Sequence, residues 1–136
     1  MKELIKVLPA EYVIYAADSS NCPYGNRSRH EIIRLTQGML AFLKHKGVKI
    51  VLIACNTISA AIQGLSISNI PILSIISPVV KHVGALGLQE VGLAATSFTV
   101  QEGIYSKLLS AANPQIRVYS RESAGLAGMI DRGGYI

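Results

Sequence analysis

Hydrophobic positions along the chain alternate between short apolar runs and longer helical repeats. Residues 50–53 form an apolar run without polar positions, which is typical of a strand covered on both faces in a parallel sheet. A helical repeat precedes this run, opened by Ser28 and Glu31 at capping-box spacing and closed by Gly47. The pattern further predicts strands at 12–17, 72–76, 91–95 and 116–119, and helices at 3–8, 57–63, 100–111, 125–130 and near Pro78. This order predicts an α/β fold with parallel, doubly wound sheets.

Composition and charge narrow the class of protein. The chain has 136 residues, of which 50% are hydrophobic and 15% charged, enough to bury the core of an ordinary domain. No apolar run is long enough to cross a bilayer and no signal peptide is evident, so we expect no membrane partner. The two cysteines, Cys22 and Cys55, form neither a disulfide framework nor a metal motif, which favours thiols in a reducing cytoplasm. The net charge of +5 is spread thinly, so we expect no nucleic-acid partner.

Polar side chains with useful chemistry follow three of the predicted strands. Because the carboxyl ends of parallel strands meet at one edge of a sheet, we expect these side chains to lie close together. A carboxylate suits an ammonium group, and hydroxyls and backbone amides suit carboxylates, so the set predicts a site for a small zwitterion. From position alone, Cys55 is either a reactive thiol or a small packing residue. The residues are Asp18, Pro23, Tyr24, Gly25, Cys55, Asn56, Thr57, Thr96 and Thr99.

These residues resemble the motifs of glutamate racemases, in the aspartate/glutamate racemase superfamily. The matching segments run in order over nearly the whole chain: Tyr15-Ala16-Ala17-Asp18, Pro23-Tyr24-Gly25, Ala54-Cys55-Asn56-Thr57, and Ala95-Thr96 with Thr99. The resemblance implies two α/β lobes with the substrate between them. It also implies cofactor-independent interconversion of L- and D-glutamate, with the D-isomer supplied to peptidoglycan.

The resemblance further implies a role for each matching residue. Removing the α-proton without a cofactor calls for two thiol bases, one on each face of Cα, and Cys55 matches one of them. Asp18 matches an acidic residue near the family's active site, which assists ionisation. No cofactor and no metal are expected. The residues expected to bind glutamate are Pro23, Tyr24, Gly25, Asn56, Thr57, Thr96 and Thr99.

The family pattern extends beyond this sequence at both ends. Members begin with a strand ending in an Asp-Ser-Gly turn and carry a second cysteine in a Gly-Cys-Thr-His segment, and Cys22 lacks the context to replace that cysteine. We therefore expect residues 1–71 to form part of the first lobe and 72–136 to open the second, both incomplete. We also expect self-association into a homo-oligomer and no racemase turnover by this chain alone. Two alternatives stay open: a superfamily racemase acting on aspartate or a hydantoin, and a binding module without catalysis.

Overall fold

The computed structural model of the chain describes residues 1–123, 125–131 and 133. Both strand pairs, β1 with β2 and β3 with β4, are parallel, which confirms the predicted α/β fold with parallel strands. The strands are β1 (Val51–Ile53), β2 (Ile72–Ser74), β3 (Glu90–Ala95) and β4 (Arg117–Glu122). The helices are α1 (Lys2–Val7), α2 (Arg29–His45), α3 (Asn56–Ala61), α4 (Ile76–Ala85), α5 (Ser97–Glu102), α6 (Ile104–Ala112) and α7 (Leu126–Asp131), with 3-10 turns η1 (Ser19–Asn21) and η2 (Tyr24–Asn26).

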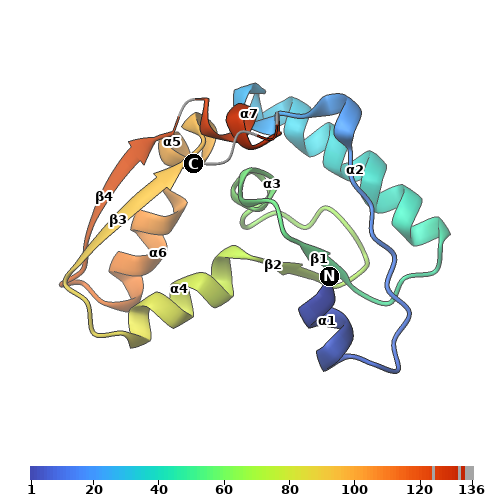
Figure 1. The fold of residues 1–136 in the computed structure, drawn as a ribbon, viewed down its shortest axis with the longest axis horizontal. Coiled ribbons are helices and arrows are strands. Elements are labelled where there is room, and N and C mark those ends of the chain that lie inside the picture. The colour runs from blue at the N-terminus through green and yellow to red at the C-terminus, as the bar shows by residue number, and fades with distance from the viewer. Residues whose placement is uncertain (124, 132, 134–136) are drawn as a thin grey trace.

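The two sheets lie in opposite halves of the molecule, joined along the chain by α4 (Figure 1). One hydrophobic core nevertheless spans both halves, because Ile32 of α2 and Ala60 of α3 belong to the same cluster as Phe98 of α5 and Leu109 of α6. A second cluster packs α2 against β1. The division of the chain into two lobes at residue 71 stays a prediction, and the pairing of β2 with β1 places Ile72–Ser74 in the sheet of the first half.

Helix α2 begins and ends where the sequence predicts. The Ser28 hydroxyl accepts a hydrogen bond from the Glu31 backbone N–H, and the Glu31 carboxylate accepts one from the Ser28 N–H at 3.0 Å. After the C-cap Lys46, Gly47 takes a left-handed φ of +73°, which ends the helix at little steric cost. The capping signals are local in sequence, and this is why the pattern alone locates the helix.

The predicted strand at residues 12–17 is wrong. The structure assigns no strand to these residues, and Tyr15 is 73% exposed. An apolar pattern reports a tendency toward extended backbone, whereas a strand also needs a hydrogen-bonded neighbour. The expectation that residues 50–53 are covered on both faces is also wrong, because Leu52 is 51% exposed while Val51 and Ile53 are buried.

The predicted helix at 100–111 is two helices. Helix α5 begins earlier, at Ser97, because the Thr96 side chain caps it by accepting from the Thr99 N–H. Gly103, with φ of +62°, then separates α5 from α6. The cap at Thr96 places the first turn of α5 directly at the end of β3, where the candidate site lies.

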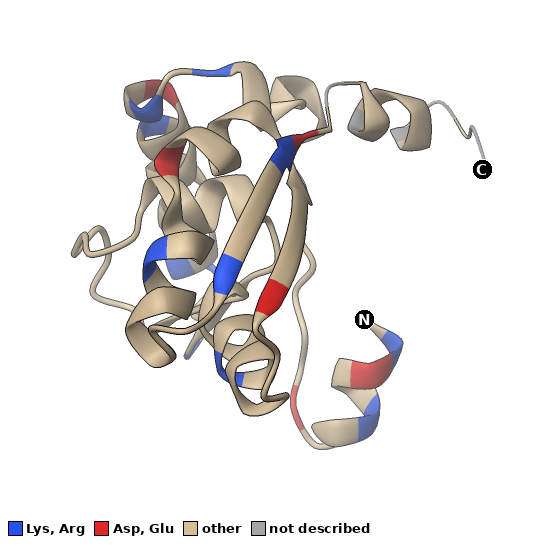
Figure 2. Cartoon of the chain, turned by 90° about the vertical axis from the view of Figure 1, so that its left-hand side faces the viewer, with Lys and Arg blue, Asp and Glu red and all other residues tan. Residues whose placement is uncertain are grey.

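The surface carries mixed charge. Figure 2 shows Lys and Arg spread over the described chain, interspersed with acidic residues. The ion pair between Arg29 of α2 and Glu102 of α5 (2.8 Å) joins the two halves. No helix in the described ranges has the length and apolar character needed to cross a membrane.

Candidate active site

Asp18 is held by two side chains that follow it closely in sequence. The Tyr24 hydroxyl donates to its Oδ2 at 2.7 Å, and Asn21 Nδ2 lies 2.9 Å from each carboxylate oxygen. The Tyr24 bond, and then the Asn21 bond, hold the pKa of Asp18 below its ordinary value. Burial of Tyr24, followed by its bond to Asp18, raises the pKa of Tyr24, so its hydroxyl stays protonated and donates. Asp18 is therefore a fixed carboxylate at neutral pH.

Replacing Tyr24 with Phe is expected to raise the pKa of Asp18. The folded-state pKa is depressed, so this carboxylate stabilises the fold above its ordinary pKa of 3.8, and the contribution is lost as the pH falls through the folded-state pKa. Tyr24→Phe removes the largest cause and shrinks this acid-sensitive contribution. Carboxyl ¹³C NMR titration of Asp18 measures the change, with Tyr12→Phe, at a fully exposed position, as the control. Equal Asp18 titration curves in all three proteins would contradict the assignment.

Three threonine hydroxyls form a row between the two halves of the molecule. Thr57 Oγ1, in α3, lies 3.0 Å from Thr96 Oγ1, which in turn lies 3.0 Å from Thr99 Oγ1 in α5. Thr57 and Thr99 are 4% and 1% exposed, so their hydroxyls depend on these contacts. The row forms because β1 and β3, which belong to different sheets, both end here, and the carboxyl ends of parallel strands are where α/β proteins place ligands.

Gly25 packs directly against this row. A Cβ atom at position 25 would lie 2.7 Å from Thr96 Cβ, closer than real atoms approach. Gly25 and the adjoining Tyr24 are buried in η2, whereas Pro23 at its N-cap is exposed. The absence of a side chain at position 25 therefore allows η2 to rest on the cap of α5.

Cys55 lies at the head of α3, between β1 and the threonine row. It is half-buried, and its carbonyl accepts from the Ser59 N–H at 3.0 Å, which fixes the first turn. Besides burial, the charges of Asp18 and Cys55 both contribute to raising the pKa of Tyr24. Cys55 therefore lies close enough to the Asp18–Tyr24 pair for their charges to interact. The next residue, Asn56, is exposed and accepts at Oδ1 a hydrogen bond from the Tyr105 hydroxyl.

Short contacts thus link Asp18 to Tyr24, and Thr96 to Thr57, Thr99 and Gly25. Pro23, Cys55 and Asn56 adjoin these groups along the chain. Sequence reasoning missed Asn21 and Tyr105, which hold Asp18 and Asn56. Asn21 had a local signal, three residues after Asp18, but Tyr105 is 49 residues from Asn56 and had none. In the part of the chain that the structure describes, no three His, Cys, Asp or Glu side chains gather as a metal ion requires.

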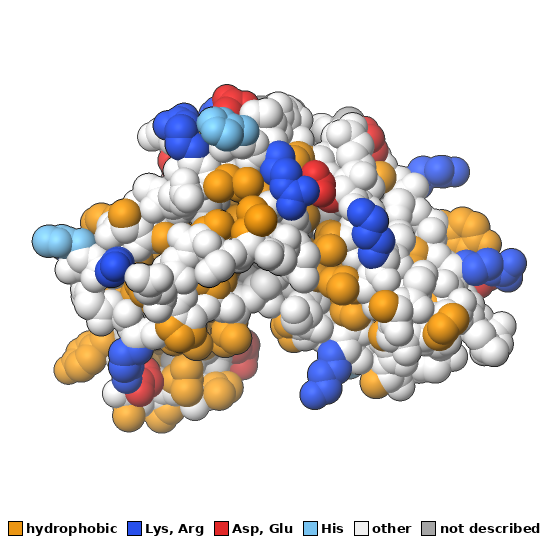
Figure 3. Space-filling model, turned by 180° about the vertical axis from the view of Figure 1, so that it is seen from behind, with side chains coloured by type: hydrophobic (Ala, Val, Ile, Leu, Met, Phe, Trp, Pro, Cys, Tyr) orange, Lys and Arg blue, Asp and Glu red, His pale blue; other side chains and the backbone are white. Residues whose placement is uncertain are grey.

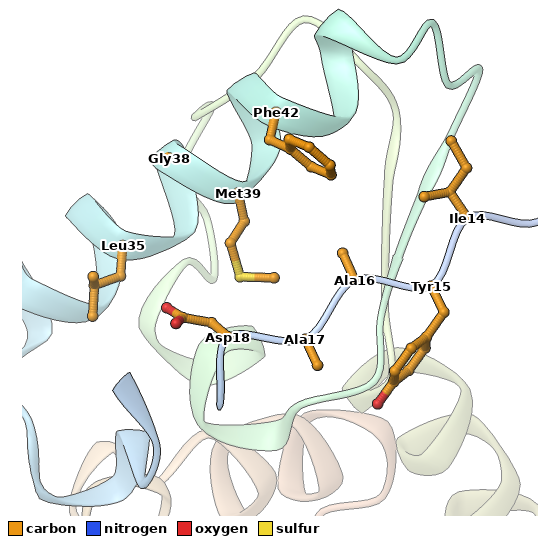
Figure 4. A pocket seen from close by; sticks show the side chains of 9 residues that line it. All are labelled: Ile14, Tyr15, Ala16, Ala17, Asp18, Leu35, Gly38, Met39 and Phe42. Carbon is orange, nitrogen blue, oxygen red and sulfur yellow. The ribbon is translucent and has the colours of Figure 1, made fainter. Parts of the chain in front are cut away.

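An open pocket of about 560 Å³ lies between the extended segment 14–18 and α2. Met39 and Phe42 of α2 point toward this segment, whereas Tyr15 points away from α2 (Figure 4). Asp18 lines the pocket, but the other eight predicted site residues do not. The pocket therefore adjoins the candidate site at Asp18 without containing it.

Comparison with known proteins gives the family. A family model described as Asp/Glu/Hydantoin racemase matches residues 1–134. The chain belongs to this racemase family. A curated glutamate racemase from Geobacter metallireducens is 34% identical over 124 residues, covering 89% of this chain and 46% of that protein. Glutamate racemase 3 from Caldanaerobacter subterraneus subsp. tengcongensis is 37% identical over 138 residues, with coverages of 99% and 49%.

Solved racemases share the fold. The crystal structure of glutamate racemase from Francisella tularensis in complex with D-glutamate matches with a TM-score of 0.86 at 34% identity, over 97% of this chain and 50% of that chain. The Bacillus anthracis racemase isoform RacE1 matches with a TM-score of 0.85 at 30% identity, over 96% and 50%. The chain therefore spans about half the length of the racemases it matches. The predicted family is confirmed, and the roles of individual residues stay predictions.

Proposed function

We propose that this chain forms one face of a cofactor-independent glutamate racemase site, with Cys55 as one of its two bases. The observation that carries the proposal is the row of Thr57, Thr96 and Thr99 hydroxyls beside Cys55, at the meeting of the ends of β1 and β3. Hydroxyls and the Asn56 amide suit a carboxylate, and Asp18 suits an ammonium group. The family relatives named glutamate racemase support glutamate as the amino acid.

The proposed chemistry is a proton transfer at Cα. The Cys55 thiolate takes the α-proton and becomes a thiol, while the electron pair left on Cα spreads into the substrate carboxylate. Thr96 has one hydroxyl hydrogen for two neighbours, so one of the Thr57 and Thr99 hydroxyls donates to Thr96, and the other, with the Asn56 amide, stabilises the added negative charge on the carboxylate oxygens. Inversion then requires a second acid to donate a proton to the opposite face of Cα. Pro23, Tyr24 and Gly25 would hold the substrate partly through their backbone.

Purified alone, the chain is expected to bind glutamate without racemising it, because Cys55 serves one face of Cα only. Isothermal titration with L- and D-glutamate measures binding, and aspartate serves as the comparison ligand. Incubation of each glutamate isomer in D₂O, followed by mass spectrometry and chiral chromatography, measures exchange and inversion. Two-way exchange with racemisation would overturn the expectation of inactivity, whereas failure to bind either isomer would overturn the proposed site.

The cellular setting is part of the same proposal. A two-base enzyme that uses thiols needs them reduced, which fits a reducing cytoplasm, where the complete enzyme would supply D-glutamate for peptidoglycan. We also propose that the chain self-associates, since hydrophobic side chains are exposed over both halves of the face in Figure 3. Sedimentation measures this directly: a mass above the 14.6 kDa of one chain is expected, and a strict monomer would contradict it.

A further inference from the structure

Tyr105 reaches the candidate site from the opposite half of the molecule. It lies in α6, is 7% exposed, and belongs to the core shared by both halves. Its hydroxyl donates to Oδ1 of Asn56, at the start of α3. A ring fixed in a packed core therefore holds a side chain on the exposed surface beside Cys55.

This hydrogen bond determines which atoms of Asn56 are left for a ligand. An asparagine amide has one acceptor oxygen and a nitrogen with two donor hydrogens. Tyr105 donates to one of the two lone pairs of the oxygen, which turns the oxygen toward α6, and no acceptor among the described residues pairs with the Asn56 nitrogen. Burial raises the pKa of Tyr105, so its hydroxyl keeps the proton that it donates. Within the described chain, the Asn56 nitrogen is consequently left with both of its hydrogens to donate.

We propose that Tyr105 is a positioning residue that orients the Asn56 amide, so that its Nδ2 donates to a carboxylate oxygen of the substrate. The identity of that carboxylate rests on the proposed function, whereas the orientation of the amide does not. A side chain already held in its binding orientation loses less freedom when the ligand binds, and this strengthens the complex. The Asn56 nitrogen also discriminates between the charged groups of an amino acid, because a hydrogen-bond donor favours an anionic oxygen over an ammonium group.

The test replaces Tyr105 with Phe, which keeps the ring in the core and removes only the hydroxyl. The side-chain ¹H–¹⁵N resonances of Asn56, assigned by comparison with Asn56→Ala, are expected to shift, since the amide oxygen loses its donor. Glutamate affinity is expected to weaken about fivefold, the equivalent of one ordinary hydrogen bond of about 1 kcal/mol. Tyr119→Phe is the matched control. The Tyr119 hydroxyl, in β4, lies 3.4 Å from Glu90 of β3, so its loss is expected to change neither the Asn56 resonances nor the glutamate affinity.

A second variant separates the acceptor and donor roles of position 56. Asn56→Asp keeps an oxygen for the Tyr105 hydroxyl but replaces the donor nitrogen with a negatively charged oxygen. Glutamate affinity is expected to fall by at least about tenfold, more than in Tyr105→Phe, because the new carboxylate repels that of the substrate. Asn56→Asp with unchanged affinity would show that Asn56 does not donate to the substrate.

The two readings separate this inference from the proposed function. If the unsubstituted chain fails to bind glutamate while Tyr105→Phe still shifts the Asn56 resonances, the proposed function fails and the positioning of the amide stands. If the chain binds glutamate and Tyr105→Phe leaves both the resonances and the affinity unchanged, the positioning role is overturned and the proposed function stands. A large loss of thermal stability in Tyr105→Phe with unshifted Asn56 resonances would assign Tyr105 to the core alone.

Discussion

Gly25→Ala is expected to lower the free energy of unfolding by about 1–3 kcal/mol, the usual cost of forcing an extra carbon into a packed site. The added Cβ would lie 2.7 Å from Thr96 Cβ and 2.9 Å from Thr96 Cγ2, and neither atom is the end of a flexible side chain. Either η2 or the first turn of α5 must move. Movement of Thr96 breaks its contacts with Thr57 and Thr99, so glutamate affinity is expected to fall by at least about tenfold.

Guanidinium denaturation and glutamate titration measure the two effects of Gly25→Ala. The matched control is Gly38→Ala in the middle of α2, where a Cβ would meet nothing within 4 Å. Alanine favours a helix over glycine, so this control is expected to gain about 0.5–1 kcal/mol. If Gly25→Ala were as stable as the unsubstituted chain and bound glutamate equally well, the close packing of η2 on Thr96 would be refuted.

Thr96→Val is expected to lower the free energy of unfolding by at least about 3 kcal/mol while keeping the shape of the side chain. The substitution removes the N-cap of α5, worth about 1 kcal/mol, and leaves the buried Thr57 and Thr99 hydroxyls without their shared partner, at about 1–3 kcal/mol for each unpaired buried group. The α5 end of the site is expected to loosen, so glutamate binding should be lost together with stability.

Thr96→Ser separates the hydroxyl from the methyl group. Serine keeps the cap and the hydroxyl row and loses one methyl group, so it is expected to cost only about 1 kcal/mol and to retain glutamate binding. Guanidinium denaturation compares the stability of the two variants, and glutamate titration compares their affinity. A larger loss in Thr96→Ser than in Thr96→Val would mean that the methyl packing on Gly25, which valine keeps, rather than the hydroxyl, carries the effect.

Features set by neighbouring residues could be predicted from the sequence. The capping box of Ser28 and Glu31 locates α2, and the small polar residues after each apolar run mark the strand ends at Cys55 and Thr96. The closeness of Thr57 to Thr96 was expected from strands sharing one sheet edge, but β1 and β3 belong to different sheets, and the two residues meet where the ends of those sheets face each other. The helix start and the strand ends depend on local chemistry, whereas the meeting of the two sheets does not.

Features set by distant partners could not be predicted. Whether residues 12–17 pair as a strand depends on a neighbouring strand that their own pattern does not encode. The exposure of Leu52 likewise depends on what covers the sheet. The contact between Tyr105 and Asn56 arises from how α6 packs in the shared core, and an aromatic residue on a helix face is by itself an ordinary core residue.

The core that spans both halves has a thermodynamic consequence. Since Ile32, Ala60, Phe98 and Leu109 pack in one cluster, loss of packing in either half removes support from the other, and the chain should unfold in a single cooperative step. Linkage then distributes the free energy of ligand binding over the whole chain. Amide protons in β4 should therefore become more slowly exchanging when glutamate occupies a site at the ends of β1 and β3.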